Sequence, residues 1–324
     1  MKIAAFEIRE WEERDFRNAD DSGKYELRLD NGPLTAEAAE TLDGFDAVSV
    51  LDSILDGNVL DILKRKGVRF ITTRTIGYDR IDVAYAKSLG IRVANASYPP
   101  DGVAEFAIML MLLCLRRYKA SLYRVATNDY SLRGLTGREL GKMTVGVVGT
   151  GGIGGAVIRL LAGFGSRILA CGRSRNAELA ACADYVELDA LFRESDLITF
   201  HVPLTEETRH MVDDSSLAMM KDGVILINTA RGELMRTETL ISGIETQKIG
   251  ALGLDVFEGE QGIYHRYRAT DILTNRNMAY LRQFPNVTMT QHMAFFTETD
   301  ISSMVLGSLE NLLAMYEGGE AREL

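Results

Sequence analysis

One short stretch constrains the fold of this chain more than any other. The apolar run Val145–Val148 leads directly into Gly149-Thr-Gly151-Gly-Ile-Gly154, and a helical pattern follows from Ile153 to Phe164. A strand, a G-x-G-x-x-G turn and a helix in this order hold the pyrophosphate of a dinucleotide. Gly149 permits the tight turn, Gly151 lets the phosphates approach the backbone, and Gly154 lets helix and strand pack closely. The positive end of the helix dipole favours the phosphates.

Apolar runs separated by helical segments continue from Thr144 to the last fifth of the chain. We expect six strands at Val145–Val148, Ile168–Cys171, Leu197–Phe200, Val224–Asn228, Ala251–Asp255 and Val287–Thr290. Strands that alternate with helices predict a parallel Rossmann sheet. Ligands bind at the carboxyl ends of such strands, and further candidate cofactor contacts are Gly152, Ile153, Val202, Pro203, Thr229 and Ala230.

The first hundred residues show the same alternation and predict a second parallel sheet, flavodoxin-like, with helices on both faces. The expected strands are Ile3–Phe6, Ala47–Leu51, Val68–Thr72 and Ile91–Ala94, and the expected helices are Thr35–Leu42, Asn58–Lys66 and Val83–Leu89. Tyr98-Pro99-Pro100 interrupts the pattern, and Asp101 is expected to cap a long helix that ends at Tyr118.

The expected α/β architecture therefore has two doubly wound domains. The final helix, Asp300–Tyr316, is expected to pack back on the first of them. We predict a discontinuous substrate domain, residues 1–100 and 293–324, into which a dinucleotide-binding domain, residues 101–292, is inserted.

Charge and composition narrow the function classes. The net charge of −10 disfavours nucleic acid, whose phosphates need clustered Lys and Arg. The longest apolar run, Phe106–Leu115, is too short to span a membrane, which takes roughly 20 residues. Cys114, Cys171 and Cys182 have neither CxxC nor metal-like spacing, so no metal site is expected. The N-terminus lacks a signal peptide's apolar stretch, and we expect a cytoplasmic protein.

The second strand of the dinucleotide fold normally ends in an acid that binds the ribose diol of NAD. This chain has Gly172 in that place, followed by Arg173, Ser174 and Arg175. Guanidinium groups bind phosphate well, so the sequence predicts that NADP(H) is favoured over NAD(H). The alternative is that both arginines are solvated loop charges and the protein accepts either cofactor.

Three ionisable residues follow strand ends in the second half of the chain: Arg231, Glu260 and His292. The planar fork of Arg231 suits a carboxylate and can polarise a ketone. His292 suits acid–base work, and Glu260 could orient it and raise its pKa. Each could also be an ordinary surface or capping residue. Among the other histidines, we expect His201 to be structural or to line the cofactor, and His210 and His265 to be solvated.

The chain resembles the D-2-hydroxyacid dehydrogenases nearly end to end. The matching pieces are Gly149–Gly154, Asn228-Thr-Ala-Arg-Gly232, Leu254-Asp-Val-Phe-Glu-Gly-Glu260 and Pro285-Asn-Val…Gln-His292. Within the family, the long segment between Glu260 and His292 is similar to the D-lactate and branched-chain 2-hydroxyacid dehydrogenases. The Arg-Ser-Arg run looks most like the enzymes of vancomycin-resistance operons.

This resemblance implies a reduction of a 2-keto acid to the D (R) hydroxy acid. Hydride would come from the nicotinamide, a proton from His292, and the carboxylate would meet Arg231 and the backbone N–H groups of Ile76 and Gly77. The resemblance also places Tyr98 in the substrate pocket, Asp255 near the nicotinamide carboxamide and Val103 against the ring. We also expect the domains to close over the cofactor, because substrate groups come from both halves and water must be excluded. The apolar helix Glu105–Arg117 has more hydrophobic surface than one face needs, and we expect a homodimer to bury it, as the resemblance also implies.

Departures from the family pattern bear on specificity. Gly152 replaces a longer residue, which removes one pyrophosphate contact. Leu51 stands near a tyrosine position of the lactate enzymes, and Phe295 adds an apolar wall after His292. We expect a pocket of Leu51, Tyr98 and Phe295 to accept acids larger than pyruvate, such as 2-ketoisocaproate or phenylpyruvate, with a graded preference.

Two other readings remain open at this point. A glyoxylate/hydroxypyruvate or phosphoglycerate dehydrogenase is the alternative among enzymes. A nucleotide-sensing, corepressor-like protein is the alternative outside them, although such a protein would not need Arg231, Glu260 and His292 together.

Overall fold

A computed structural model describes residues 1–20 and 23–324 of the chain. The chain divides into two compact units: Met1–Pro99 with Phe296–Leu324, and Pro100–Phe295. The crossings lie at Pro99/Pro100 and Phe295/Phe296, a few residues from the expected positions at 100/101 and 292/293. The second crossing comes later because Met293 and Ala294 are still held by hydrogen bonds to Asp255 of the second unit.

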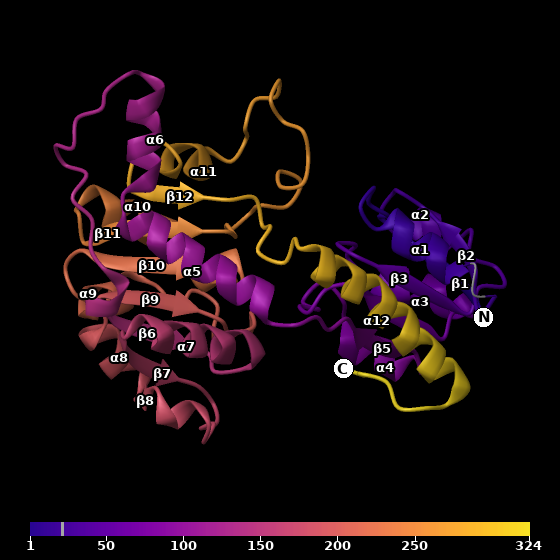
Figure 1. Cartoon of the computed structure of the whole chain (residues 1–324). Helices are drawn as coiled ribbons and strands as arrows, with labels where there is room; N and C mark the ends of the chain where they lie inside the picture. The colour runs from indigo at the N-terminus through magenta and orange to yellow at the C-terminus, as the bar shows by residue number, and fades with distance from the viewer. Residues whose placement is uncertain (21–22) are drawn as a thin grey trace. The chain divides into compact units, whose positions relative to one another are not determined.

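The first unit is built on a parallel sheet with the order β2-β1-β3-β4-β5 (Figure 1). Its strands are β1 Lys2–Ala5, β2 Glu26–Leu29, β3 Ala47–Val50, β4 Phe70–Thr73 and β5 Arg92–Asn95. This is the flavodoxin-like order. Alternate residues of β1 serve opposite faces, because successive side chains of a strand point to opposite sides: Ile3 and Ala5 belong to one core cluster, and Ala4 and Phe6 to the other.

Helices cover both faces of this sheet. They are α1 Glu13–Asp20, α2 Ala36–Ala39, α3 Gly57–Arg65, α4 Val83–Ser88 and α12 Glu298–Glu317. The C-terminal helix α12 returns to the first unit and packs against β4, β5 and α1 (Figure 1). Its buried residues Val305, Leu309 and Leu312 complete the same core cluster as Phe16 of α1.

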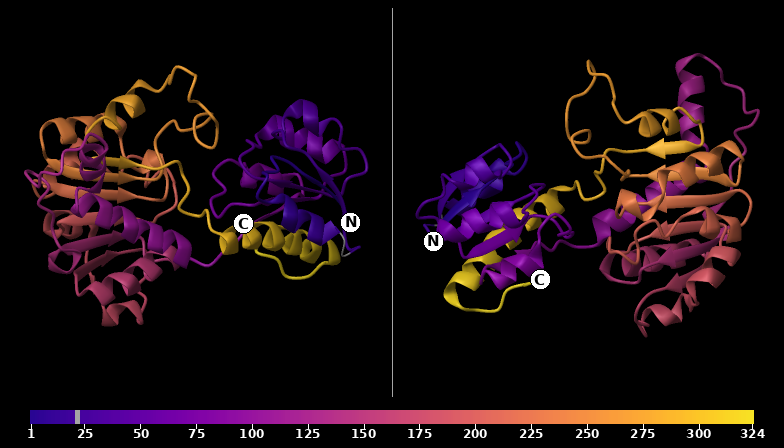
Figure 2. Two further views of the ribbon diagram at one scale, coloured as in Figure 1. Left: turned by 45° about the horizontal axis from the view of Figure 1, so that its top comes forward. Right: turned by 180° about the vertical axis from the view of Figure 1, so that it is seen from behind.

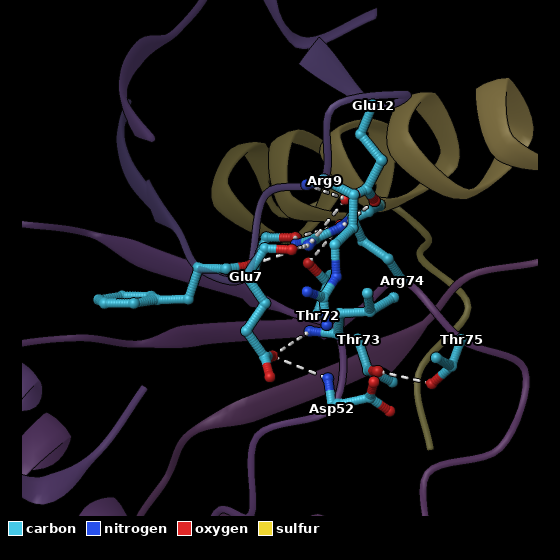
Figure 3. Close-up of polar contacts among 12 residues, drawn as sticks. Glu7, Arg9, Glu12, Asp52, Thr72, Thr73, Arg74 and Thr75 are labelled. Atoms are coloured by element: carbon cyan, nitrogen blue, oxygen red, sulfur yellow. Dashed lines mark hydrogen bonds and ion pairs between the residues drawn. The ribbon is translucent and has the colours of Figure 1, made fainter. Parts of the chain in front are cut away.

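A buried polar network joins the carboxyl ends of β1, β3 and β4 (Figure 3). Arg74 is fully buried and its Nε donates to Glu12 at 2.7 Å. The carboxylate of Glu7 accepts the backbone N–H groups of Leu51, Asp52 and Ser53 at 2.7–3.0 Å. Buried charges require such partners, and the network fixes the loops that follow β3 and β4.

The second unit contains a larger parallel sheet with the order β12-β11-β10-β9-β6-β7-β8. Its strands are β6 Thr144–Val148, β7 Arg167–Cys171, β8 Asp184–Tyr185, β9 Leu197–Phe200, β10 Val224–Asn228, β11 Ile249–Leu254 and β12 Val287–Met289. Counted within this unit the order begins 3-2-1-4-5-6, which is that of a Rossmann sheet. Figure 2 shows the sheet from two further sides.

The α-helices of this unit also lie on both faces of the sheet. They are α5 Asp101–Leu115, α6 Tyr118–Ala126, α7 Gly152–Phe164, α8 Leu188–Glu194, α9 Asp214–Met219, α10 Thr237–Glu245 and α11 Arg276–Leu281. Short 3-10 turns are η1 Leu140–Lys142, η2 Leu179–Ala181 and η3 Gly232–Leu234. Helices α5 and α7 pack on each other and share one core cluster with Val145 and Val147 of β6.

The α/β class and both doubly wound sheets are as the sequence predicts, but several local predictions are wrong. Asp101 does not cap α5: it is the first helical residue, and Pro100 is the cap. The expected helix to Tyr118 is two helices, because Arg117 adopts a left-handed conformation with φ of 50°. Strands β2 and β8 were not expected, since both are short and polar edge strands.

Among the helices of the described residues, none combines the length and the hydrophobicity that a membrane-spanning segment needs.

Candidate active site

The glycine turn after β6 has the shape of a phosphate cradle. Gly149 has φ of 94°, and a Cβ there would run into the carbonyl of His201. A Cβ on Gly154 would collide with the carbonyl oxygen of Gly149, so only glycine lets α7 start this close to the strand. A Cβ on Gly151 would meet nothing within 4 Å, which leaves the N-terminus of α7 open. These residues fit a bound pyrophosphate.

The loop after β7 is where the sequence predicts that the ribose binds. A Cβ on Gly172 would meet Thr150 Oγ1, so the loop passes close to the glycine turn. Arg173, Ser174 and Arg175 are exposed. The guanidinium groups therefore lie on the solvent side of the chain, available to an anion.

The turn after β10 is built to present Arg231. The side chain of Asn228 closes the turn: its Nδ2 donates to Arg231 O at 2.8 Å, and its Oδ1 accepts Ala230 N–H at 3.0 Å. A Cβ on Gly232 would collide with the backbone of Phe257, so glycine brings this turn against the loop that carries Glu260. Thr229 Oγ1 is buried without a hydrogen-bond partner among the described residues, as expected of a group reserved for a ligand.

His292 and Glu260 form a direct pair. His292 Nδ1 and Glu260 Oε1 are 2.5 Å apart, and the two side chains are 27% and 11% exposed. The second carboxylate oxygen of Glu260 accepts Phe257 N–H at 2.7 Å, so the carboxylate cannot rotate freely. Because Nδ1 is occupied, Nε2 is the nitrogen of His292 that can exchange a proton with a substrate.

The electrostatics of the site favour a protonated His292. Burial lowers its pKa, but the hydrogen bond and charge of Glu260 and the charge of Asp255 raise it. The charge of Arg231 opposes this rise, which places the guanidinium within electrostatic reach of the imidazole. The net result is a pKa above the ordinary value for histidine, as suits a group that donates a proton near neutral pH.

Asp255 fixes the backbone around His292 through hydrogen bonds. It is fully buried, and its carboxylate accepts Met293 N–H at 2.9 Å, Ala294 N–H at 2.8 Å and the Thr290 hydroxyl at 2.6 Å. His292 itself has φ of 54°, a strained region for a residue with a side chain. Asp255 therefore stabilises an unusual turn, and its contact with a nicotinamide carboxamide stays a prediction.

The other histidines differ from the sequence expectation in part. Burial lowers the pKa of His201 to about 3, and its Nε2 lies 2.9 Å from Thr199 Oγ1, so it is neutral. His210 is not simply solvated, because its Nε2 lies 2.7 Å from Glu258 Oε1. His265 is exposed but its Nε2 contacts the carbonyl of His292 at 2.9 Å. Both lie in irregular segments, where no periodicity predicts a partner.

The structure brings Arg231, Glu260 and His292 together within the second unit. Phe295 belongs to the same unit, and its ring lies 6.3 Å from that of His292. Val103 is buried on α5, while Val202 is half-buried and Pro203 exposed after β9.

The expected substrate residues Leu51, Ile76, Gly77 and Tyr98 lie in the first unit, on loops after its strands. The Ile76 carbonyl accepts Asn95 Nδ2 at 2.6 Å and the Gly77 carbonyl accepts the Thr75 hydroxyl at 2.5 Å. These bonds fix the carbonyl groups of the turn. Among the residues that the structure describes, no three His, Cys, Asp or Glu side chains gather as a metal site requires.

A dinucleotide cradle, an imidazole–carboxylate pair and a guanidinium in one Rossmann unit define a nicotinamide-dependent oxidoreductase. Residues 108–294 match the family model described as D-isomer specific 2-hydroxyacid dehydrogenase, NAD binding domain. The chain belongs to this family, and it is an oxidoreductase that acts on 2-hydroxy acids with a nicotinamide cofactor.

Full-length relatives agree with this assignment. The chain is 38% identical over 315 residues to the aromatic 2-oxoacid reductase of Clostridium sporogenes, covering 96% of this chain and 95% of that protein. It is 36% identical over 322 residues to the D-lactate dehydrogenase of Escherichia coli, covering 98% of each. The solved structure of D-2-hydroxyisocaproate dehydrogenase superposes with a TM-score of 0.89 at 32% identity, over 100% of this chain and 99% of the other.

Proposed function

We propose that this enzyme reduces 2-oxo acids larger than pyruvate to their D (R) hydroxy acids and prefers NADPH. The observation that carries the catalytic part is the His292–Glu260 pair at 2.5 Å beside the charge of Arg231. An imidazolium held beside a guanidinium can protonate and polarise one carbonyl oxygen, which is what reduction of a ketone requires.

Each residue then has a defined task. A dihydronicotinamide dinucleotide held at the glycine turn Gly149–Gly154 would supply the hydride chemistry that reduction of the oxo acid at C2 requires. His292 gives the proton on Nε2 to the carbonyl oxygen, and Glu260 stabilises the imidazolium before that transfer. Arg231 binds the substrate carboxylate through its planar fork. For Ile76 and Gly77 in the first unit, the proposed task is to donate their backbone N–H groups to a carboxylate. The reverse reaction requires neutral His292 as the base.

The cofactor preference is supported by the loop after β7. The exposed Arg173 and Arg175 stand beside Ser174, and Gly172 offers no carboxylate to repel a 2′-phosphate. The enzyme binds NAD(H) through the same domain, and the preference concerns the additional phosphate. The test is the ratio of kcat/KM for NADPH to that for NADH, and a value below one contradicts the proposal. In the same domain, we propose that Thr229, Ala230, Val202, Pro203 and Val103 contact the nicotinamide half.

The proposed substrate class follows from the chemistry of the expected substrate residues, which are Leu51 and Tyr98 in the first unit and Phe295 in the second. One aliphatic and two aromatic side chains suit a larger apolar substituent on C3. Steady-state kinetics with pyruvate, 2-ketoisocaproate and phenylpyruvate, each with both cofactors, test this directly. A higher kcat/KM for pyruvate than for both larger acids contradicts the proposed preference for larger substrates. Absence of reduction of all three acids contradicts the whole proposal.

A homodimer is proposed from the surface of the second unit. Helices α5, α6 and α7 form an apolar groove of about 580 Å³, lined by Ile108, Met109, Leu112, Leu113, Tyr118, Leu160 and Phe164 with Glu105 and Arg116. Phe164 is 45% exposed and Met109 39% exposed, which is unusual for large apolar side chains gathered in one place. A second copy of the same helices would cover this face. We also propose a cytoplasmic location, since the cysteines of the chain are unpaired.

A further inference from the structure

The loop between β11 and α11 carries a residue that the chemistry above does not use. Residues 261–275 contain neither helix nor strand and run beyond the sheet in Figure 2. The loop is nevertheless fixed at its start, because Ile263 and Tyr264 donate backbone hydrogen bonds to Glu260 O at 3.0 and 3.2 Å. Both side chains also pack against the core. The position of the next residue, His265, is therefore fixed.

His265 lies next to His292, the proposed proton donor. The ring centroid of His265 lies 6.0 Å from that of His292 and 6.2 Å from that of Phe295, and His292 and Phe295 are 6.3 Å apart. The three rings thus form a triangle in which each contacts the other two at distances typical of aromatic pairs. The contacts are tilted or edge-to-face.

His265 is held in this triangle at some conformational cost. Its φ is 58°, in the left-handed region that residues with side chains rarely adopt. Its Nε2 lies 2.9 Å from the carbonyl oxygen of His292. A carbonyl only accepts hydrogen bonds, so Nε2 of His265 carries the hydrogen and the ring is tethered at its far end. Strained residues held in this way concentrate at ligand sites.

The position of the substrate follows from the proton donor. Nδ1 of His292 is bonded to Glu260, so the ketone oxygen must approach Nε2 of the same ring. A substituent on the ketone carbon then lies within one side-chain length of the imidazole, in the range of roughly 4.5–7 Å at which rings interact. The methyl group of pyruvate offers nothing to stack, whereas a planar substituent reaches the neighbouring rings.

We propose that His265, with Phe295, is a specificity-determining residue that recognises an aromatic side chain on the 2-oxo acid. This proposal rests on the reductase activity proposed above and narrows its substrate to aryl-pyruvates. The edge of the tethered imidazole packs against the face of the substrate ring, and the exposed side of His265 admits a substituent too large for a closed pocket.

A different role would follow if the hydrogen bond to the His292 carbonyl mattered more than the ring. His265 would then only hold the left-handed backbone of His292, and its loss would slow every substrate alike. Two substitutions separate the roles. His265→Phe keeps a ring and removes the hydrogen bond, whereas His265→Gln keeps a donor of similar reach and removes the ring. Tyr267→Gln, at an 83% exposed position of the same loop, is the matched control.

The experiment measures kcat/KM for phenylpyruvate and for pyruvate in the wild type and the three variants. In His265→Gln we expect the phenylpyruvate to pyruvate ratio to fall about tenfold, the loss of one ring contact. The fall should come mainly from kcat/KM for phenylpyruvate, because pyruvate has no ring for the imidazole to contact. In His265→Phe and Tyr267→Gln the ratio should stay within about twofold of wild type. His265→Phe keeps an aromatic ring at this position, and Tyr267→Gln leaves His265 unchanged.

Several results would overturn this role. Equal losses for both substrates in His265→Phe, with His265→Gln near wild type, would show that the residue only holds His292 through its hydrogen bond. A phenylpyruvate to pyruvate ratio that falls as far in His265→Phe as in His265→Gln would show that a ring at this position does not recognise the substrate. An unchanged ratio in His265→Gln would show that the ring does not touch the substrate. A wild-type enzyme that reduces neither acid would instead refute the assigned activity, together with the role that depends on it. Retained cofactor binding in each variant reports that the second unit is folded.

Discussion

The pH dependence of Glu260→Gln is the most direct test of the proposed acid. In the native protein the pKa of His292 is raised because Glu260 and Asp255 outweigh burial and the charge of Arg231. The glutamine amide can still accept Phe257 N–H through its oxygen, so the loop is retained. Its NH₂ group then faces Nδ1 of His292 and stabilises the neutral ring, while burial and Arg231 continue to lower the pKa.

The size of the effect follows from the geometry of the pair. A carboxylate within hydrogen-bond distance shifts the pKa of its partner by about 1–3 units, and each unit corresponds to about 1.4 kcal/mol. Because the His292 side chain is 27% exposed, solvent screens part of this interaction, and we expect a shift of about 1 unit. Reduction needs the imidazolium, so its rate is constant below the pKa of His292 and falls above it.

The assay is kcat/KM for 2-oxo acid reduction between pH 5 and pH 9, which reports ionisations of the free enzyme. In Glu260→Gln the falling limb should move to lower pH by about 1 unit, from above the ordinary histidine pKa to below it. Glu258→Gln is the control, because Glu258 pairs with His210 at 2.7 Å and not with His292. A limb at the same pH in wild type and Glu260→Gln would refute the reasoning.

Four further outcomes follow from the same structure. His292→Gln should lower kcat for reduction by about 10²–10⁴-fold, because the proton donor is lost, and a near-normal kcat would exclude His292. Arg231→Lys should raise KM for the oxo acid and lower kcat, since lysine lacks the fork; unchanged steady-state parameters would contradict this. The double variant Arg173→Ala/Arg175→Ala should raise KM for NADPH with little change for NADH, and equal changes would show that the arginines do not read the phosphate. Leu112→Asp should produce monomers in light-scattering measurements, and a dimer that persists would place the interface elsewhere.

The sequence predicted the features that depend on local chemistry and strand order. The glycine spacing after Val148 requires a close approach of backbone to backbone, and the structure shows the collisions that any side chain at Gly149 or Gly154 would cause. Alternation of apolar and helical segments predicted both doubly wound sheets. The three ionisable residues each follow a strand, and in a parallel sheet the ends of strands meet at one edge.

Features that depend on contacts between distant segments could not be predicted in this way. The burial of Arg74 against Glu12 and the anchoring of Leu51 by Glu7 involve residues 62 and 44 positions apart. No pattern near Arg74 distinguishes a buried guanidinium from a solvated one. The break at Arg117 likewise escaped the prediction, since a single left-handed residue leaves the apolar periodicity on either side unchanged.

His265 shows most clearly the difference between features that the sequence predicts and features that depend on the tertiary structure. Its neighbours Arg266 and Arg268 give the segment the composition of a solvated loop. Composition alone does not tell which part of the fold an irregular loop contacts. The chain's amino acids determined the dinucleotide turn, the parallel sheets and the choice of His292 as the proposed proton donor, because those follow from spacing and side-chain chemistry. Only the tertiary structure decided which imidazole lies beside that donor, because the contact is made across 27 residues by packing of Ile263 and Tyr264 on the core.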